Sequence, residues 1–139
     1  MKSDESRDFA TFLRDREAAA RAYVRGDAGP LRQLATRTDP ATFFGPRGGH
    51  EAGAEKVDAR YSRDAESFTA GSKTHFEVLH QGASGDLGYW VGYQHASVHL
   101  RGKDDPVSMR LRVTEVFRHE DGAWKLIHRH ADAAEEPTR

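Results

Sequence analysis

The sequence has 139 residues, a formal net charge of −1 and no cysteine. Hydrophobic residues make up 37% and charged residues 31%, a balance typical of one compact domain, here 1–139. The lack of cysteine excludes disulfides and thiolate-bound metals, and the evenly spread charge gives no electrostatic reason to bind nucleic acid or a membrane. The polar N-terminal segment lacks the apolar stretch of a signal peptide, so we expect a cytoplasmic protein.

The first half of the chain has the pattern of helices. Apolar residues recur every three or four positions between Asp4, a candidate cap, and Gly26, a stop signal, and they predict an amphipathic helix of about six turns. A short second helix, a short strand and a third helix are expected at residues 30–35, 41–44 and 51–68.

The second half has the pattern of strands separated by turns that contain Gly, Asp or Pro. We expect four strands, at residues 74–81, 87–100, 107–118 and 123–131. Helices followed by an antiparallel meander indicate an α+β fold with the helices packed on one face of a sheet.

One part of this meander resembles a known superfamily. Residues 112–130 have the pattern R-x-T-x-V-F-R…D-G-x-W-K-x-x-H-x-H, and residues 23–27 and 43–49 add weaker similarity. The pattern resembles SnoaL-like and ketosteroid-isomerase-like domains of the nuclear transport factor two superfamily, and the association domain of calcium/calmodulin-dependent kinase two. The resemblance implies a cone-shaped, curved antiparallel sheet wrapped around the long N-terminal helix, with two further helices. It also implies homodimers, and the Arg- and Ala-rich composition indicates a bacterial source.

Alternation of side chains along each strand divides the sheet into two faces. We expect Val116 to pair with Leu126, and Val98 to pair with Met109. By resemblance, the inner face lines a cavity that would hold a small, largely apolar ligand without a cofactor. The pocket residues expected from this are Tyr23, Phe44, Trp90, Gln94, Val113, Glu115 and Ile127.

The outer face would carry more aromatic residues than a monomer usually exposes, and such residues are enriched at interfaces. We therefore expect a homodimer joined through this face. The interface residues expected are Tyr89, Val91, Tyr93, His95, Trp124 and His128.

Glu115 is the expected polar group of the inner face, and it has two interpretations. With Gln94 it could orient or protonate a ligand, because a carboxylate in an apolar cavity has a raised pKa unless it is paired. Alternatively it pairs with Arg129 or with an arginine of the helix, and only holds the sheet together.

The pair His128 and His130 also has two interpretations. Two histidines two positions apart on a strand project together and could chelate a metal with His95 or Asp132, or His130 could act as a general base. The pair also belongs to the pattern of the resembling families, where it occurs without metal. We expect no metal, and a structural role with Arg112 and Thr114.

Ketosteroid isomerisation needs a carboxylate base and acidic donors to an oxyanion. The resemblance places Gly45 where the catalytic aspartate stands and Ala19 near the catalytic tyrosine, so this mechanism is not expected. Glu115, His130 and Asp132 are the remaining candidates for acid–base chemistry of the isomerase or cyclase type.

Two functions therefore stay open, and whether the protein is an enzyme stays open with them. One is a SnoaL-like protein that binds a ligand or acts on it; the other is a non-catalytic dimerisation or association module. A cavity of several hundred Å3 lined by Trp90, Gln94 and Glu115 would favour the first, and a cavity filled by side chains would favour the second.

Overall fold

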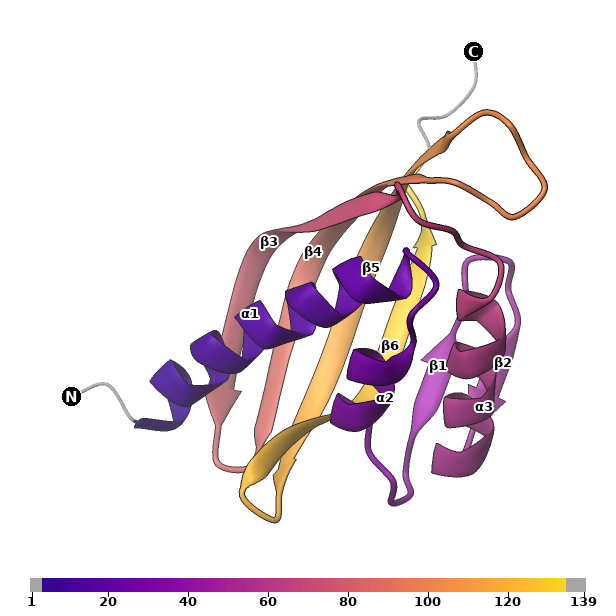
Figure 1. Ribbon diagram of the computed structural model, residues 1–139. Coiled ribbons are helices and arrows are strands. Elements are labelled where there is room, and N and C mark those ends of the chain that lie inside the picture. The colour runs from indigo at the N-terminus through magenta and orange to yellow at the C-terminus, as the bar shows by residue number, and fades with distance from the viewer. Residues whose placement is uncertain (1–3, 135–139) are drawn as a thin grey trace.

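The computed structural model describes residues 4–134 and has the predicted α+β architecture, with helices before the meander (Figure 1). The helices of this range are α1 (Asp4–Tyr23), α2 (Gly29–Leu34) and α3 (Ala54–Ala65). Its strands are β1 (Thr42–Phe44), β2 (His50–Ala52), β3 (Lys73–Ser84), β4 (Leu87–Val98), β5 (Val107–Glu120) and β6 (Ala123–Ala133). None of the helices in the described range is long and apolar enough to cross a membrane.

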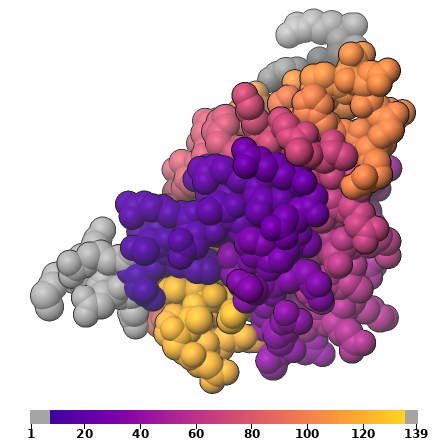
Figure 2. All heavy atoms as spheres, viewed as in Figure 1, coloured from indigo at the N-terminus to yellow at the C-terminus, as the bar shows by residue number. Residues whose placement is uncertain are grey.

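All six strands form one curved sheet in the order β2-β1-β6-β5-β4-β3. The predicted antiparallel meander of β3 to β6 is confirmed, and β1 pairs antiparallel with β2 but parallel with β6. Helix α1 crosses the inner face of β3 to β6, and α2 and α3 cover the end at β6 and β1 (Figure 1). The space-filling view from the same side shows these helices closing over that face (Figure 2).

The third helix starts later than the sequence suggests, because residues 50–52 form β2 instead of its first turn. Gly53 has a φ of 104°, and its N–H donates to the carbonyl of Ala41 at 2.8 Å, so the chain turns there before helix α3 begins. The Asp39 carboxylate then accepts a hydrogen bond from the N–H of Ala54 and caps the helix.

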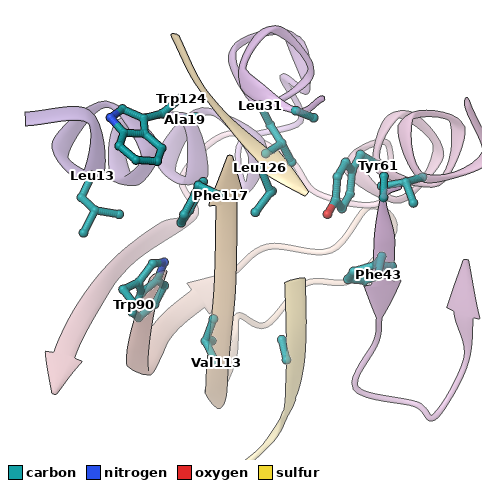
Figure 3. Packing of buried hydrophobic residues seen from close by; sticks show 14 of the residues in the cluster. Leu13, Ala19, Leu31, Phe43, Tyr61, Trp90, Val113, Phe117, Trp124 and Leu126 are labelled. Carbon is teal, nitrogen blue, oxygen red and sulfur yellow. The ribbon is translucent and has the colours of Figure 1, made fainter. Parts of the chain in front are cut away.

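A layer of aromatic side chains forms the core between α1 and the sheet. The ring of Phe9 lies 5.5 Å from that of Phe117 and 5.0 Å from that of Trp124. Figure 3 shows Trp90, Phe117 and Trp124 between the strands and the helices. Since Trp124 is only 4% exposed, it belongs to the protomer's own core, and the prediction that it lies in a dimer interface is wrong.

The register of β6 explains this correction. Val116 pairs with His128 rather than with Leu126, and Phe117 pairs with Leu126, so Ile127 is a bulged residue without a partner on β5. A bulge adds one residue and reverses the alternation. Trp124 and Leu126 therefore lie on the inner face, while His128 stays on the outer face as expected.

The pairing of β4 with β5 also differs from the prediction. Val98 pairs with Val107, and Met109 pairs with Ala96. The difference is two residues, which leaves every side chain on its predicted face. Trp90 consequently lies opposite Glu115 on the inner face.

Gly88 lets α1 approach the sheet closely. A Cβ at this position would lie 2.7 Å from the ring of Phe9, in a packed core. We expect Gly88→Ala to lower the free energy of unfolding by about 1–3 kcal/mol, the usual effect of overpacking. Gly49→Ala, where nothing lies within 4 Å, is the matched control in urea denaturation. Equal stability of the two variants would contradict this packing.

Candidate functional site

The most buried polar group of the inner face is the carboxylate of Glu115, with an exposed fraction of 0%. Arg16 of α1 donates to it through Nε at 2.9 Å and through Nη2 at 2.8 Å. Arg129 of β6 donates through Nη1 at 2.6 Å, and the indole Nε1 of Trp90 donates at 2.8 Å. One carboxylate therefore joins the helix to three neighbouring strands.

The network continues across the sheet towards β3. The second terminal nitrogen of Arg129 donates to Gln94 Oε1 at 2.7 Å, and Gln94 Nε2 donates to Thr74 Oγ1 at 3.0 Å. Thr74 donates in turn to the carbonyl of His95 at 2.8 Å. We call Arg16, Thr74, Trp90, Gln94, Glu115 and Arg129 the inner network. Its bonds hold α1 and the strands β3 to β6 in one arrangement.

The charge state of Glu115 follows from this environment. Burial by itself would raise the pKa of the carboxyl group, but the guanidinium groups of Arg16 and Arg129 outweigh burial and lower the pKa to about 2. Such a carboxylate is a weak base, and its four contacts leave little capacity for a ligand. The geometry therefore favours the alternative in which Glu115 is paired and holds the sheet together.

Two tyrosines stand beside this network, Tyr61 on α3 and Tyr23 at the end of α1. Burial raises the pKa of both hydroxyls well above the ordinary value, so they stay protonated at neutral pH. Figure 3 shows the Tyr61 hydroxyl pointing from α3 towards the sheet. Both can act only as neutral hydrogen-bonding groups.

The remaining expected pocket residues do not all reach the inner face. Val113 lies there and is 2% exposed. Phe44 is 41% exposed and lies on the outer face, with its ring 5.1 Å from that of His128 and 5.5 Å from that of His130. Placing Phe44 in the pocket is therefore wrong, because the parallel pairing of β1 with β6 turns Phe43 inward instead. Ile127, the bulged residue, is half-buried.

Three hollows of the described range lie elsewhere. They have volumes of about 550, 420 and 310 Å3, and none of these three is lined by Trp90, Gln94 or Glu115. The first lies over the start of β3 and the second between α1, α2 and the β5–β6 turn. The third lies over the outer side of β4 and β5. The carboxylate of Glu115 is itself enclosed by the side chains of Arg16, Trp90 and Arg129.

The outer face carries a group of partly exposed apolar, aromatic and histidine side chains over β4, β5, β6 and β1. We call it the outer patch: Phe44, Tyr89, Val91, Tyr93, Val116, His128 and His130. Leu79, 58% exposed at the bulge of β3, lies beside it and lines the 310 Å3 groove together with Val91 and Tyr93. Five of the six expected interface residues, all but Trp124, have outward-facing positions on this side.

The candidate acid–base residues are separated by the sheet. His130 and Asp132 lie on the outer face, and Glu115 lies on the inner face. Asp132 accepts two hydrogen bonds from Arg112, at 2.7 and 2.8 Å, and this pairing lowers the pKa of its carboxyl group. The structure therefore does not bring Glu115 together with His130 or Asp132 as an acid–base pair.

His128 is held in place by a hydrogen bond between its Nδ1 and Thr42 Oγ1, at 2.7 Å. Burial lowers the pKa of this imidazole, and the neighbouring His130 lowers it further. Within residues 4–134, no group of three or more His, Asp or Glu side chains has an arrangement that could hold a metal ion.

Sequence reasoning did not single out Arg16, although it anchors the inner network. The signal is visible in the helical pattern: Phe9, Leu13, Arg16, Ala20 and Tyr23 follow one another at spacings of three or four. A charged residue inside the apolar stripe of a helix needs a buried partner.

A long helix packed on the inner face of such a sheet is the fold of nuclear-transport-factor-2-like proteins. A family model described as a SnoaL-like domain matches residues 16–134, so the chain belongs to the SnoaL-like domain family. No curated protein matches the sequence.

Several solved bacterial structures share the fold. An NTF2-like superfamily protein from Salmonella enterica has 14% identity and a TM-score of 0.75, and the match covers 95% of this chain and 92% of that one. A candidate dehydratase of the NTF2-like family from Streptomyces avermitilis has 19% identity and a TM-score of 0.69, with 93% and 96% covered. A candidate calcium/calmodulin-dependent protein kinase type II association domain from Thiobacillus denitrificans has 18% identity and a TM-score of 0.62, with 85% and 88% covered. At these identities the likeness establishes the fold alone.

Removing the charge of Glu115 should destabilise the protein strongly. Glu115→Gln keeps the shape but leaves two guanidinium groups without their counter-ion, and we expect a loss of about 3–5 kcal/mol of unfolding free energy in urea. The control is Glu77→Gln, because the Glu77 carboxylate is 52% exposed and pairs with His95 at the surface. We expect less than about 1 kcal/mol there. A similar small loss for both variants would show that the inner network contributes little.

The same carboxylate should make the stability depend on pH. Its folded pKa, about 2, lies below the ordinary value of 4.5, so its stabilisation is present above pH 4.5 and is lost as the pH falls towards 2. We expect wild type to lose about 3 kcal/mol over this range in excess of Glu115→Gln, measured by urea denaturation at each pH. Parallel curves for the two proteins would be incompatible with the lowered pKa.

Proposed function

We propose that this SnoaL-like domain is a non-catalytic association module, in which the outer patch joins two copies of the chain. The single observation that carries the proposal is the inner network. Glu115 is bonded to Arg16, Arg129 and Trp90 with no exposed surface, so the place where a ligand would bind is occupied by the protein itself.

The outer patch supports a second copy of the chain as the partner. It combines the ring of Phe44, 41% exposed, with half-buried valines and tyrosines, and aromatic residues are enriched at interface cores. At one border the ion pair of Arg112 with Asp132 supplies a polar rim. A patch with an apolar centre and charges of both signs at its border suits an isologous contact, in which the same surface meets itself.

The alternative is a protein that binds a small, largely apolar ligand and performs acid–base chemistry on it. The likeness to a candidate dehydratase of the same fold favours it. This function would require the inner network to open, because Trp90 and Glu115 are both 0% exposed. For this reason we rank it second.

Light scattering tests the association directly. We expect wild type to be a dimer at micromolar concentration, and Val91→Glu to be a monomer with an unchanged circular dichroism spectrum, since the new charge would be buried at the centre of the interface. The matched control is Val107→Glu, because Val107 is 39% exposed at the start of β5, outside the outer patch. A monomeric wild type, or dissociation by both variants alike, would refute the proposal.

A further inference from the structure

The hollow of about 550 Å3 at one end of the outer face has a different chemistry from the outer patch. It lies over the start of β3, the end of β4 and the start of β5. Strand pairing arranges its outward-facing side chains in two rows, and residues directly opposite each other in such rows lie about 5 Å apart at Cβ. The rows are Lys73, Ser97 and Ser108, then His75, His95 and Arg110. We call these six residues the basic hollow.

Among the described residues, the positive charges of this hollow have no ion-pair partner. Within residues 4–134, neither Lys73 nor Arg110 has a carboxylate within ion-pair distance. The guanidinium of Arg110 lies 4.6 Å from the ring centroid of Tyr93, which holds its direction without cancelling its charge. In the described part of the chain, the one carboxylate that bonds a residue of the hollow is that of Glu77, at 2.8 Å from His95 Nε2.

The histidines and serines add hydrogen-bond donors between the two cations. The imidazoles of His75 and His95 stack with centroids 4.8 Å apart and planes inclined by 16°. His95 uses only Nε2 for Glu77. The hydroxyls of Ser97 and Ser108 lie in the row of Lys73, and neither donates a hydrogen bond within the described range.

We propose that the basic hollow binds an oxyanion with at least two negative charges, such as a phosphate group. Lys73 on β3 and Arg110 on β5 supply cations at opposite corners of the hollow, which suit an anion with several charged oxygens better than a single carboxylate. The hydroxyl and imidazole donors between them match the several acceptor oxygens of phosphate. The volume exceeds that of one phosphate, which leaves space for a diphosphate or for the remainder of a phosphorylated small molecule. This site is on the opposite face of the sheet from the inner network and does not depend on it.

Isothermal titration at constant ionic strength tests the site, with inorganic phosphate and pyrophosphate as probes and formate as a monovalent comparison. We expect saturable binding of both phosphates, tighter for pyrophosphate, and none of formate. Arg110→Gln and Lys73→Gln should each weaken pyrophosphate binding about tenfold, the effect of losing one charge-assisted hydrogen bond. The control is Arg14→Gln, which makes the same charge change on an exposed position of α1.

The outcomes separate this site from the association proposed above. Light scattering on the same samples reports the oligomeric state, so phosphate binding by a monomeric protein would refute the association and leave the site standing. No saturable binding of either phosphate overturns the site. Equal weakening by Arg14→Gln also overturns it, because it would show a general charge effect instead of a local one.

Discussion

The arrangement of the whole domain depends on one buried carboxylate shared by two arginines. A charge without solvent is costly unless it is paired and hydrogen-bonded, and Glu115 meets this condition only when α1, β4, β5 and β6 are all in place. Arg16 reaches it from the helix, and Arg129 reaches it from the last strand. Any sliding of α1 along the sheet would separate the charges. The inner network therefore fixes the position of α1 on the sheet. The aromatic contacts of α1 would fix this position less well by themselves, because they depend less on direction than hydrogen bonds do.

Because the inner network stabilises the fold, its side chains on the inner face are already engaged in contacts within the protein. This face borders the space between α1 and the sheet. Here Trp90, Phe117 and the inner network occupy it, and the carboxylate that could have served as a base has a pKa of about 2. A group that is permanently ionised and bonded on all sides stabilises the fold at the expense of proton transfer.

The sequence predicts this site only where the strands have regular alternation of side chains. Alternation along β4 and β5 placed Trp90, Gln94 and Glu115 together, because both strands are regular over these residues and a two-residue register error preserves the faces. Alternation failed on β6, where the bulge at Ile127 exchanges the faces, so Trp124 was assigned to the wrong side. No residue type in this segment of β6 predicts a bulge.

Phe44 was misplaced for a related reason. A strand of three residues offers no periodicity of its own, and its face is set by the non-local parallel pairing with β6. Arg16, in contrast, could have been found, since a charge at a core position of an amphipathic helix is a local signal. The sequence therefore predicts regular elements and their faces well, and it predicts poorly where a long-range contact decides which way a side chain points.

The division between two faces explains how one small sheet can carry several properties. Side chains that alternate along β4 contribute Trp90 and Gln94 to the inner network, and contribute Val91, Tyr93 and His95 to the opposite side. Along the outer side the composition changes from aromatic and aliphatic residues to the cations of the basic hollow within one or two residues of Tyr93. Because these surfaces share a backbone but no side chains, a substitution in one need not disturb another. That separation makes the proposed association, the proposed anion binding and the core stability distinguishable by single substitutions in the same domain.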